Sequence, residues 1–224
     1  MCGRFTLTVS PGQLQDAFPW VEVPYDLQPR YNIAPTQPVA VIPNNGKNCL
    51  DFFVWGLIPS WAKDHNIGYR MINARSETLH EKPAFRAAYR RRRCLVLTDG
   101  FYEWRQEPGM KLKTPFFIQF ASKKPFAFAG LWENWQSPDG SEVLSCTIIT
   151  TPPNKLIEPI HNRMPAILDP QVYSDWLEPA ERDHSQMSKW LQPYSADNMI
   201  AYPVSRLVNS PENDTPECIQ PLSS

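Results

Sequence analysis

The 24 prolines of this chain of 224 residues constrain its fold more than any other feature. Proline fixes one backbone angle and lacks an amide hydrogen, so it is disfavoured inside helices and in central strands. Its share is about twice the ~5% of an average protein, and the prolines are spread along the whole chain. This distribution predicts a compact protein of short strands joined by stiff connections.

Short apolar runs bounded by turn residues indicate that much of the chain is β-structure. Residues 38–57 hold two such runs around an Asn-Asn-Gly turn, which predicts a β-hairpin. Turns are also expected at Asp99-Gly100, between a buried and an aromatic strand, and in the SPDG sequence at 137–140. Further strands are expected at 94–98, 101–104, 114–121, 125–135, 142–151 and 199–205.

Short helices are expected between these strands. The first begins at Ser10 with Pro11 in its first turn, and Asp169-Pro170 repeats that signature. The sequence shows neither an internal repeat nor a linker. It therefore predicts a single, sheet-rich α+β domain over residues 2–220, with 221–224 as a short C-terminal end. The expected helices cover residues 10–18, 82–93, 169–177 and 184–191.

Charge and cysteine usage narrow the class of protein. The net charge is −1, so a nucleic-acid site would need local clusters of Arg and Lys. The N-terminal sequence is not that of a signal peptide, and no apolar run approaches the ~18 residues of a membrane span. No two of the five cysteines have CxxC spacing, which argues against a zinc site. We expect a cytoplasmic protein with reduced thiols, no metal and no cofactor.

Cys2 directly follows the initiator methionine. Aminopeptidases remove Met1 before a small residue, and removal would leave an amine and a thiol on adjacent carbons. Such a pair condenses with aldehydes to form a thiazolidine ring. An α-amine titrates near ~7.7–8.0, so a useful fraction is uncharged at neutral pH, and the thiol near ~8.5 can then close the ring. Position alone does not distinguish this group from an incidental cysteine near a chain end.

Several stretches place polar residues among rigid apolar ones in predicted turns, where functional sites usually lie. As a set, and in this order, they resemble the SOS-response-associated peptidase family, whose members are also called abasic-site-processing proteins. The resemblance runs from Cys2 to about Gln220. The stretches are CGRF (2–5), RYNIAP (30–35), WGLIPSWA (55–62), NARSET (73–78), DGFYEW (99–104), IHNRMP (160–165) and PVSRLVN (203–209).

This resemblance implies a fold of curved antiparallel and mixed sheets with short flanking helices. It also implies a DNA-damage function linked to the SOS response. Members bind single-stranded DNA that carries an abasic site, and the mature N-terminal cysteine captures the sugar aldehyde in a reversible thiazolidine crosslink. For this chain, the resemblance implies a nucleoid or DNA-associated protein, and we expect a monomer.

The resemblance also implies catalytic roles for four residues. Cys2 would be the nucleophile through its nitrogen and sulfur, and Asn73 would hold the amine or the sugar. Glu103 would be the general acid and base, because a carboxyl between two aromatic residues is expected to be desolvated, with a raised pKa. His161 would assist sugar opening and crosslink reversal. The other histidines, His65, His80 and His184, are expected at the surface.

DNA contacts are expected from motif residues of two kinds. Arginines would bind phosphates, and Trp61 with two prolines would present apolar faces to the bases, although Trp61 is also compatible with a core position. The run from Arg90 to Arg93 is expected as a solvated face with at most peripheral attraction for DNA. The residues assigned to DNA binding are Arg4, Pro35, Pro38, Trp61, Arg75, Arg163, Ser205 and Arg206.

Three other functions remain open from the sequence. Cys2 with Glu103 and His161 could form a thiol peptidase, including one that cuts only its own Met1–Cys2 bond. Class II glutamine amidotransferases also begin Met-Cys-Gly, although the later motifs do not match that family. A non-covalent single-strand binding module would protect DNA by occupancy alone, and its protection would survive the Cys2→Ala substitution.

Overall fold

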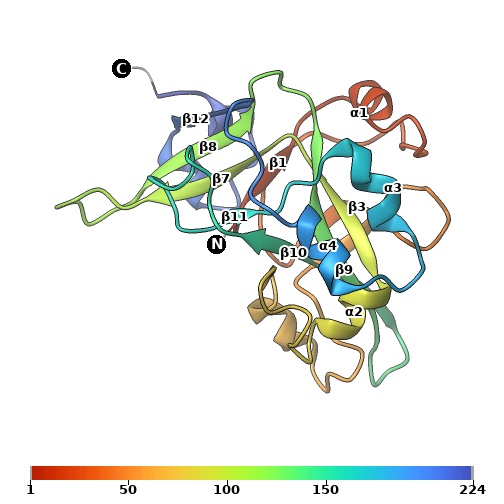
Figure 1. Ribbon diagram of the computed structural model, residues 1–224. Coiled ribbons are helices and arrows are strands. Elements are labelled where there is room, and N and C mark those ends of the chain that lie inside the picture. The colour runs from red at the N-terminus through yellow and green to blue at the C-terminus, as the bar shows by residue number, and fades with distance from the viewer. Residues whose placement is uncertain (1, 223–224) are drawn as a thin grey trace.

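Two β-sheets form the body of the protein, and short helices lie around them (Figure 1). The computed structural model describes residues 2–222. Its strands are β1 (Phe5–Leu7), β2 (Arg30–Ile33), β3 (Pro38–Pro43), β4 (Asp51–Trp55), β5 (Asn73–Arg75), β6 (Arg93–Thr98), β7 (Gly100–Arg105), β8 (Thr114–Phe120), β9 (Phe126–Gln136), β10 (Glu142–Thr151), β11 (Met164–Pro165) and β12 (Met199–Pro203).

The helices are short, as the prolines predict. The α-helices are α1 (Pro11–Ala17), α2 (Arg86–Arg91), α3 (Tyr173–Leu177) and α4 (His184–Trp190). The 3-10 helices are η1 (His65–Arg70), η2 (Pro170–Val172), η3 (Arg206–Asn209) and η4 (Pro216–Ile219). Within residues 2–222, no helix has the length and apolar character needed to cross a lipid bilayer.

The first sheet is antiparallel, with strand order β12-β8-β7-β1-β2. It carries the start of the chain in its interior, because β1 pairs with β2 on one side and with β7 on the other. The register opposes Phe5 to Ile33 and to Phe101. The residues just before β1 are thereby held between two longer strands.

The second sheet closes on itself. Strands β10, β4, β3, β6 and β9 pair in that order, and β9 pairs again with β10, which makes a barrel. Only small side chains fit at its tightest point, since a Cβ atom at Gly130 would lie 2.8 Å from Cys94 Sγ and 2.9 Å from Val96 Cγ2. The last residues of β10 extend past the barrel and pair with β5 in parallel and with β11 in antiparallel orientation.

Asp99 joins the two sheets, because it lies between β6 of the barrel and β7 of the first sheet. Its buried carboxylate accepts hydrogen bonds from the Thr6 hydroxyl, from the Thr8 amide and hydroxyl, and from the Val9 amide. Nearby, the ring of Phe5 packs on barrel residues Trp55 and Phe128, with centroids 5.1 and 5.8 Å away. These contacts fix the N-terminal strand against the barrel.

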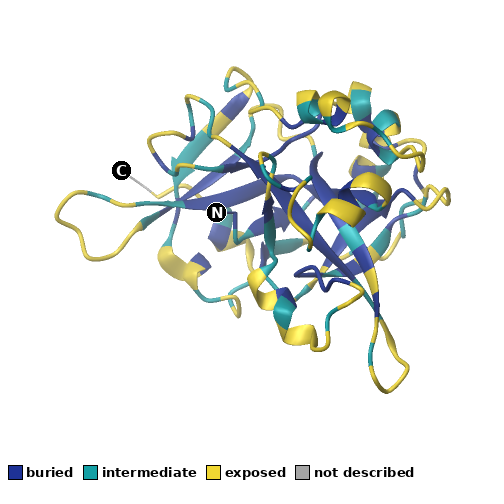
Figure 2. Ribbon diagram, turned by 60° about the horizontal axis from the view of Figure 1, so that its bottom comes forward, coloured by how far each residue is buried: buried dark blue, intermediate teal, exposed yellow. Residues whose placement is uncertain are grey.

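The predicted sheet-rich α+β class, with mixed sheets and short flanking helices, is confirmed. Ser10 caps α1 as expected, and Gln13 completes a capping box. The predicted hairpin is β3–β4, and β6 to β10 and β12 lie within a residue or two of the expected strands. The short strands β1, β2, β5 and β11 were not predicted, and the helix expected over 82–93 covers only Arg86–Arg91. Two tips, at the β7–β8 and β9–β10 hairpins, project from the body with exposed residues (Figure 2).

The arginine run departs from the expectation of a solvated face. Arg93 begins β6 with 0% of its surface exposed, and its guanidinium donates to carbonyls that include those of Trp176 and Arg90. Arg91 pairs with Glu181, and Arg92 with the buried Glu133. In four consecutive arginines the sequence alone does not reveal which one turns inward, because that depends on carbonyls supplied by distant segments.

The histidines outside the motifs also differ from separate surface side chains. Of His65, His80 and His184, only His65 is exposed to solvent. His80 and His184 are half-buried and stack with ring centroids 3.8 Å apart, and the Tyr89 hydroxyl lies 3.2 Å from Nδ1 of His184. The contact joins the segment before α2 to the start of α4, so these two histidines have a packing role.

Candidate active site around Cys2

Cys2 closely precedes β1, at the end of that interior strand of the first sheet, and 0% of its surface is exposed. The amide of Tyr102 on β7 donates to the carbonyl of Arg4 at 3.0 Å. Because the two strands run antiparallel, Glu103 is level with the residues that precede β1. The carboxyl group therefore faces the N-terminal cysteine, and its charge acts on the thiol.

Asn73 approaches Cys2 from the other sheet. It begins β5, which pairs in parallel with the far end of β10, where Asn73 opposes Ile148. Its side-chain Nδ2 donates to the carbonyl oxygen of Cys2 at 2.7 Å. The Oδ1 atom of the same amide is buried and has no hydrogen-bond partner. The amide thus fixes the backbone of Cys2 with one end and offers a free acceptor with the other.

His161 completes the group from the turn before β11. Its Nδ1 lies 3.8 Å from Oε2 of Glu103, 3.1 Å from the Arg163 amide nitrogen and 3.2 Å from the Arg163 carbonyl oxygen. An unprotonated Nδ1 accepts from that amide, and a protonated Nδ1 donates to that carbonyl. The fold therefore brings all four residues predicted as catalytic, Cys2, Asn73, Glu103 and His161, into one place.

Burial sets the protonation of these groups. It raises the pKa of Glu103, which is 2% exposed, from 4.5 to about 7. Burial, and then the negative charge of Glu103, raises the pKa of the Cys2 thiol far above its usual value. Burial lowers the pKa of His161. Near neutral pH the site thus holds a protonated thiol, an uncharged imidazole and a carboxyl that can both give and accept a proton.

Two predicted DNA-binding arginines meet at the end of β10. Arg75 opposes Thr150 in the parallel pairing of β5 with β10, and it is exposed. Arg163 donates to the Thr150 carbonyl at 2.6 Å and forms a two-pronged ion pair with Glu77. The ion pair lowers the pKa of Glu77. Arg163 is therefore held in place, whereas the guanidinium of Arg75 lies at the surface.

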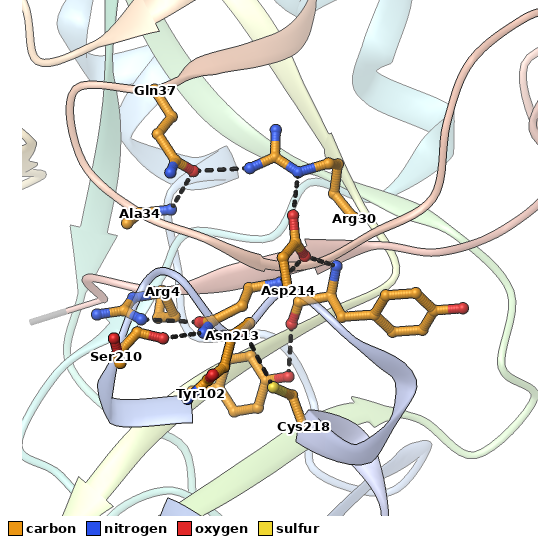
Figure 3. A network of polar contacts seen from close by, with 11 residues as sticks. Arg4, Arg30, Ala34, Gln37, Tyr102, Ser210, Asn213, Asp214 and Cys218 are labelled. Atoms are coloured by element: carbon orange, nitrogen blue, oxygen red, sulfur yellow. Dashed lines mark hydrogen bonds and ion pairs between the residues drawn. The ribbon is translucent and has the colours of Figure 1, made fainter. Parts of the chain in front are cut away.

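Arg4 lies in a network with the C-terminal segment (Figure 3). Its Nη1 donates to Asn32 Oδ1 at 2.8 Å and to the Val208 carbonyl at 2.7 Å, and burial lowers its pKa. Asn32 in turn donates to the Ser210 and Asn213 carbonyls. The guanidinium of Arg4 is thus oriented by η3 and by the residues that follow it.

Asp214 anchors this segment to β2. Its carboxylate accepts from the amides of Tyr31 and Asn32 and pairs with Arg30, whose other end reaches Gln37 (Figure 3). Neither Asn32 nor Asp214 is among the residues predicted from the sequence to have a role. Asn32 stands inside the quoted RYNIAP motif, which was a usable signal, but nothing in the local sequence relates Asp214 to β2.

The other residues assigned to DNA binding lie at the surface to different extents. Trp61 is 60% exposed, which excludes a core position for this tryptophan. Pro38 and Arg206 are exposed, and Pro35 is half-buried. The hydroxyl of Ser205 accepts from the Leu207 amide and so caps η3. Of this group, Ser205 and Arg206 are placed near Arg4 by the Val208 contact. Pro35 precedes β3, Pro38 is its first residue, and Trp61 lies in the loop after β4.

Known proteins resemble this chain in sequence over almost its whole length. "Abasic site processing protein YoqW" of Bacillus subtilis is 49% identical over 98% of this chain and 99% of its own length. "Abasic site processing protein HMCES" of Xenopus tropicalis is 33% identical over 98% of this chain and 78% of its own length.

A solved structure resembles the chain in fold. The crystal structure of a protein from Bacteroides thetaiotaomicron superimposes with a TM-score of 0.88 at 27% identity, covering 99% of this chain and 100% of that one. The sequence profile of the SOS response associated peptidase (SRAP) family matches residues 1–211. The chain therefore belongs to the SOS response associated peptidase (SRAP) family.

Proposed function

We propose that this protein captures abasic sites in single-stranded DNA through Cys2 and thereby protects the lesion from strand cleavage. One observation carries the proposal: Cys2 is enclosed by Asn73, Glu103 and His161, and the pKa of Glu103 is about 7. The names of the related proteins supply the class of substrate. The ring-opened abasic sugar has the aldehyde that an aminothiol can trap.

The chemistry begins after removal of Met1, which frees the α-amine of Cys2. The amine attacks the aldehyde carbon and forms an imine, and the sugar oxygen leaves as water. Glu103, when protonated, donates a proton to that oxygen. The Cys2 sulfur then adds to the imine carbon while its proton passes to nitrogen, and a thiazolidine results. One water is lost in total, and no electrons are transferred.

The order of these steps follows from the raised pKa of the thiol. A thiol that stays protonated is a weak first nucleophile, whereas a terminal amine is partly uncharged near neutral pH. The same property disfavours the thiol peptidase and the amidotransferase-like alternatives, both of which need a thiolate to attack first. Self-cleavage of the Met1–Cys2 bond is accordingly no more than a secondary activity in this proposal.

His161 and Asn73 have supporting roles in this proposal. The uncharged His161 can take a proton from the sugar hydroxyl when the ring opens and return it when the crosslink reverses. Asn73 holds the Cys2 backbone with Nδ2, and its unpartnered Oδ1 is an acceptor for the amine or for a sugar hydroxyl.

The DNA strand is held by residues on both sides of Cys2. On one side, phosphates are bound by Arg75 and Arg163 at the end of β10. On the other side, they are bound by Arg4 and by Arg206 of η3, and Ser205 caps that helix. Trp61 with Pro35 and Pro38 packs on bases. We propose that one chain suffices for binding, and that the protein acts as a monomer on DNA in the cytoplasm or nucleoid.

Intact mass spectrometry tests the capture step directly. The purified protein is mixed with an oligonucleotide that carries one abasic site. The expected product has the mass of protein without Met1 plus DNA minus one water, and it is absent for Cys2→Ala. Cys49→Ala is the control and should crosslink normally. Cys49 is half-buried, whereas Cys2 is buried.

Two results would contradict the proposal. If Met1 is removed and no adduct forms, the protein is not a covalent trap, and the non-covalent binding module becomes the better account. If an adduct persists in Cys2→Ala, another nucleophile is responsible.

A further inference from the structure

A cavity of about 360 Å³ lies between the loop that contains η1 and the β9–β10 hairpin. Four of the residues that line it are aromatic: Trp55, His65, Tyr69 and Trp135. The volume is in the range of small-molecule sites. None of the catalytic or DNA-binding residues assigned above lines this cavity, so it needs a separate explanation.

The two tryptophans of the cavity are rigid. The indole nitrogen of Trp135 donates to the Ala62 carbonyl at 2.7 Å, and that of Trp55 to the Ile72 carbonyl at 2.8 Å. Both polar atoms are therefore already bonded. Trp55 is 0% and Trp135 4% exposed, so the accessible aromatic surface at the cavity belongs to His65 and Tyr69. Tyr69 stands at the rim with 60% of its surface exposed.

The backbone closes one side of the cavity. A Cβ atom at Gly56 would lie 2.7 Å from the carbonyl oxygen of Gly68, and Gly56 has φ +139°. A Cβ at Gly68 would in turn lie 2.8 Å from the carbonyl oxygen of Gly56. The two segments touch through their main chains, so the wall is fixed by backbone contact and not by flexible side chains.

The cavity adjoins the candidate active site. Trp55 connects the two regions, because its ring packs on Phe5 of β1 and its nitrogen bonds to Ile72, the neighbour of Asn73. Thr36 lines the cavity between Pro35 and Pro38 in the sequence. Ala62, which follows Trp61, accepts the hydrogen bond of the cavity residue Trp135, so the cavity borders the residues proposed to pack on bases.

We propose that the cavity binds one nucleobase of the captured strand, from a nucleotide that flanks the abasic site. This inference rests on the function proposed above. The lining contains neither Lys nor Arg, so its chemistry does not match a phosphate. It does match a flat heteroaromatic ring, because the exposed rings of His65 and Tyr69 can stack on a base and the Thr36 hydroxyl can bond to its edge. Ser137 and Ser141, whose hydroxyls bond to Asp139, can still accept a hydrogen bond there.

The test uses oligonucleotides in which a tetrahydrofuran residue replaces the abasic sugar. It has no aldehyde, so binding is measured without crosslinking. The fluorescent base 2-aminopurine is placed in turn at each of the three positions on either side of the tetrahydrofuran. We expect its fluorescence to change on binding at one position only. Deleting the base at that position should weaken binding about tenfold, as for the loss of one stacked base.

Three variants relate the signal to the cavity. Ser137→Phe fills the cavity from the hairpin, and it should abolish both the fluorescence change and the penalty for deleting the base. Tyr69→Ala removes an exposed rim residue, so it leaves the fold intact and should weaken both effects. Asn134→Phe places the same ring on an exposed position of β9 outside the cavity lining and should behave as wild type.

The proposal is overturned if no position responds, or if the response survives in both Ser137→Phe and Tyr69→Ala. Crosslinking to a true abasic site, measured in parallel, separates the two ideas. A wild-type protein that crosslinks but shows no cavity-dependent signal contradicts only the base site. One that shows the signal without crosslinking contradicts only the proposed capture chemistry.

Discussion

Nδ1 of His161 lies 3.8 Å from Oε2 of Glu103, although the two residues come from different parts of the fold. Glu103 belongs to β7 of the first sheet, and His161 to the turn that leads into β11 of the second sheet. The two side chains therefore meet where the sheets adjoin, and their distance depends on how the two sheets are placed.

Glu103 should make the protein less stable as the pH rises. Its pKa is about 7 in the folded protein against an ordinary 4.5, so the folded state binds the extra proton between those values. Stability then falls as the pH increases from about 4.5 to 7, by about 3 kcal/mol in total, and stays low above. Urea unfolding of wild type and Glu103→Gln from pH 4.5 to 8 measures this. If the two proteins show the same pH dependence, the carboxyl is not buried as described.

Glu103→Gln should also slow capture. Loss of a general acid and base costs about 10²–10⁴-fold in rate, whereas binding to tetrahydrofuran DNA should not change. Single-turnover crosslinking measures the rate, and filter binding measures the affinity. Glu133→Gln is the matched control, since Glu133 is also buried with a raised pKa but pairs with Arg92. An equal slowing in both variants would indicate a general loss of stability.

Asn73→Ala should reduce the capture rate more than it reduces stability. The substitution removes the 2.7 Å hydrogen bond to the Cys2 carbonyl, which is worth about 1 kcal/mol to folding. The amine then loses its fixed position, and we expect capture to slow at least tenfold. Gln15→Ala removes a similar 2.8 Å hydrogen bond, to Val21 near α1, and should leave the rate unchanged. Unaltered capture in Asn73→Ala would exclude a positioning role.

Asp214→Asn should destabilise the protein and disturb Arg4. The substitution replaces an acceptor of two amides and of the Arg30 guanidinium, and we expect a loss of about 2 kcal/mol. Glu212→Gln, an exposed neighbour with the same change in charge, is the control and should be neutral. Thermal unfolding and DNA affinity are measured together. A variant that is destabilised but binds DNA normally would separate the C-terminal segment from the DNA site.

Arg75→Ala should weaken the salt dependence of DNA binding. Each phosphate contact on a single strand contributes about 0.7 to the slope of log affinity against log salt, so the slope should fall by about that amount. Arg90→Ala removes an equally exposed arginine on α2 and should leave the slope unchanged. Titrations of tetrahydrofuran DNA at several salt concentrations give both slopes. A smaller slope in Arg90→Ala would assign the arginine run to the DNA surface.

Local features of the sequence were sufficient to predict most elements. Ser10 and Pro11 mark the start of α1 because capping and proline geometry act within one turn. The apolar runs likewise mark the strands, because burial of a strand is visible in its own residues. The sequence does not show which strands pair. The strand β10 lies beside β4 and β5, which are many residues earlier, and the consecutive strands β6 and β7 belong to different sheets. The alternation of apolar and polar side chains shows which face of a strand is buried, but it does not show which strand pairs with it.

The site was predicted from motifs, and the structure adds how they meet. The grouping of Cys2, Asn73, Glu103 and His161 came from the family resemblance, and the fold does bring them together. Their catalytic roles, like the domain bounds 2–220, stay predictions. The contribution of Asp214 could not be foreseen, because its partners on β2 are about 180 residues away and only folding brings them within reach.

The tie between Arg4 and the C-terminal segment sets an order of events during synthesis. Cys2 leaves the ribosome first, when Val208 and Asp214 have not yet been made. At that stage the start of the chain is open to a processing enzyme. Once the last residues emerge, they bind Arg4 and β2. The N-terminal strand is therefore fastened only after residue 214 has been made, and the first residues of the chain stay accessible to any enzyme that acts on them during synthesis.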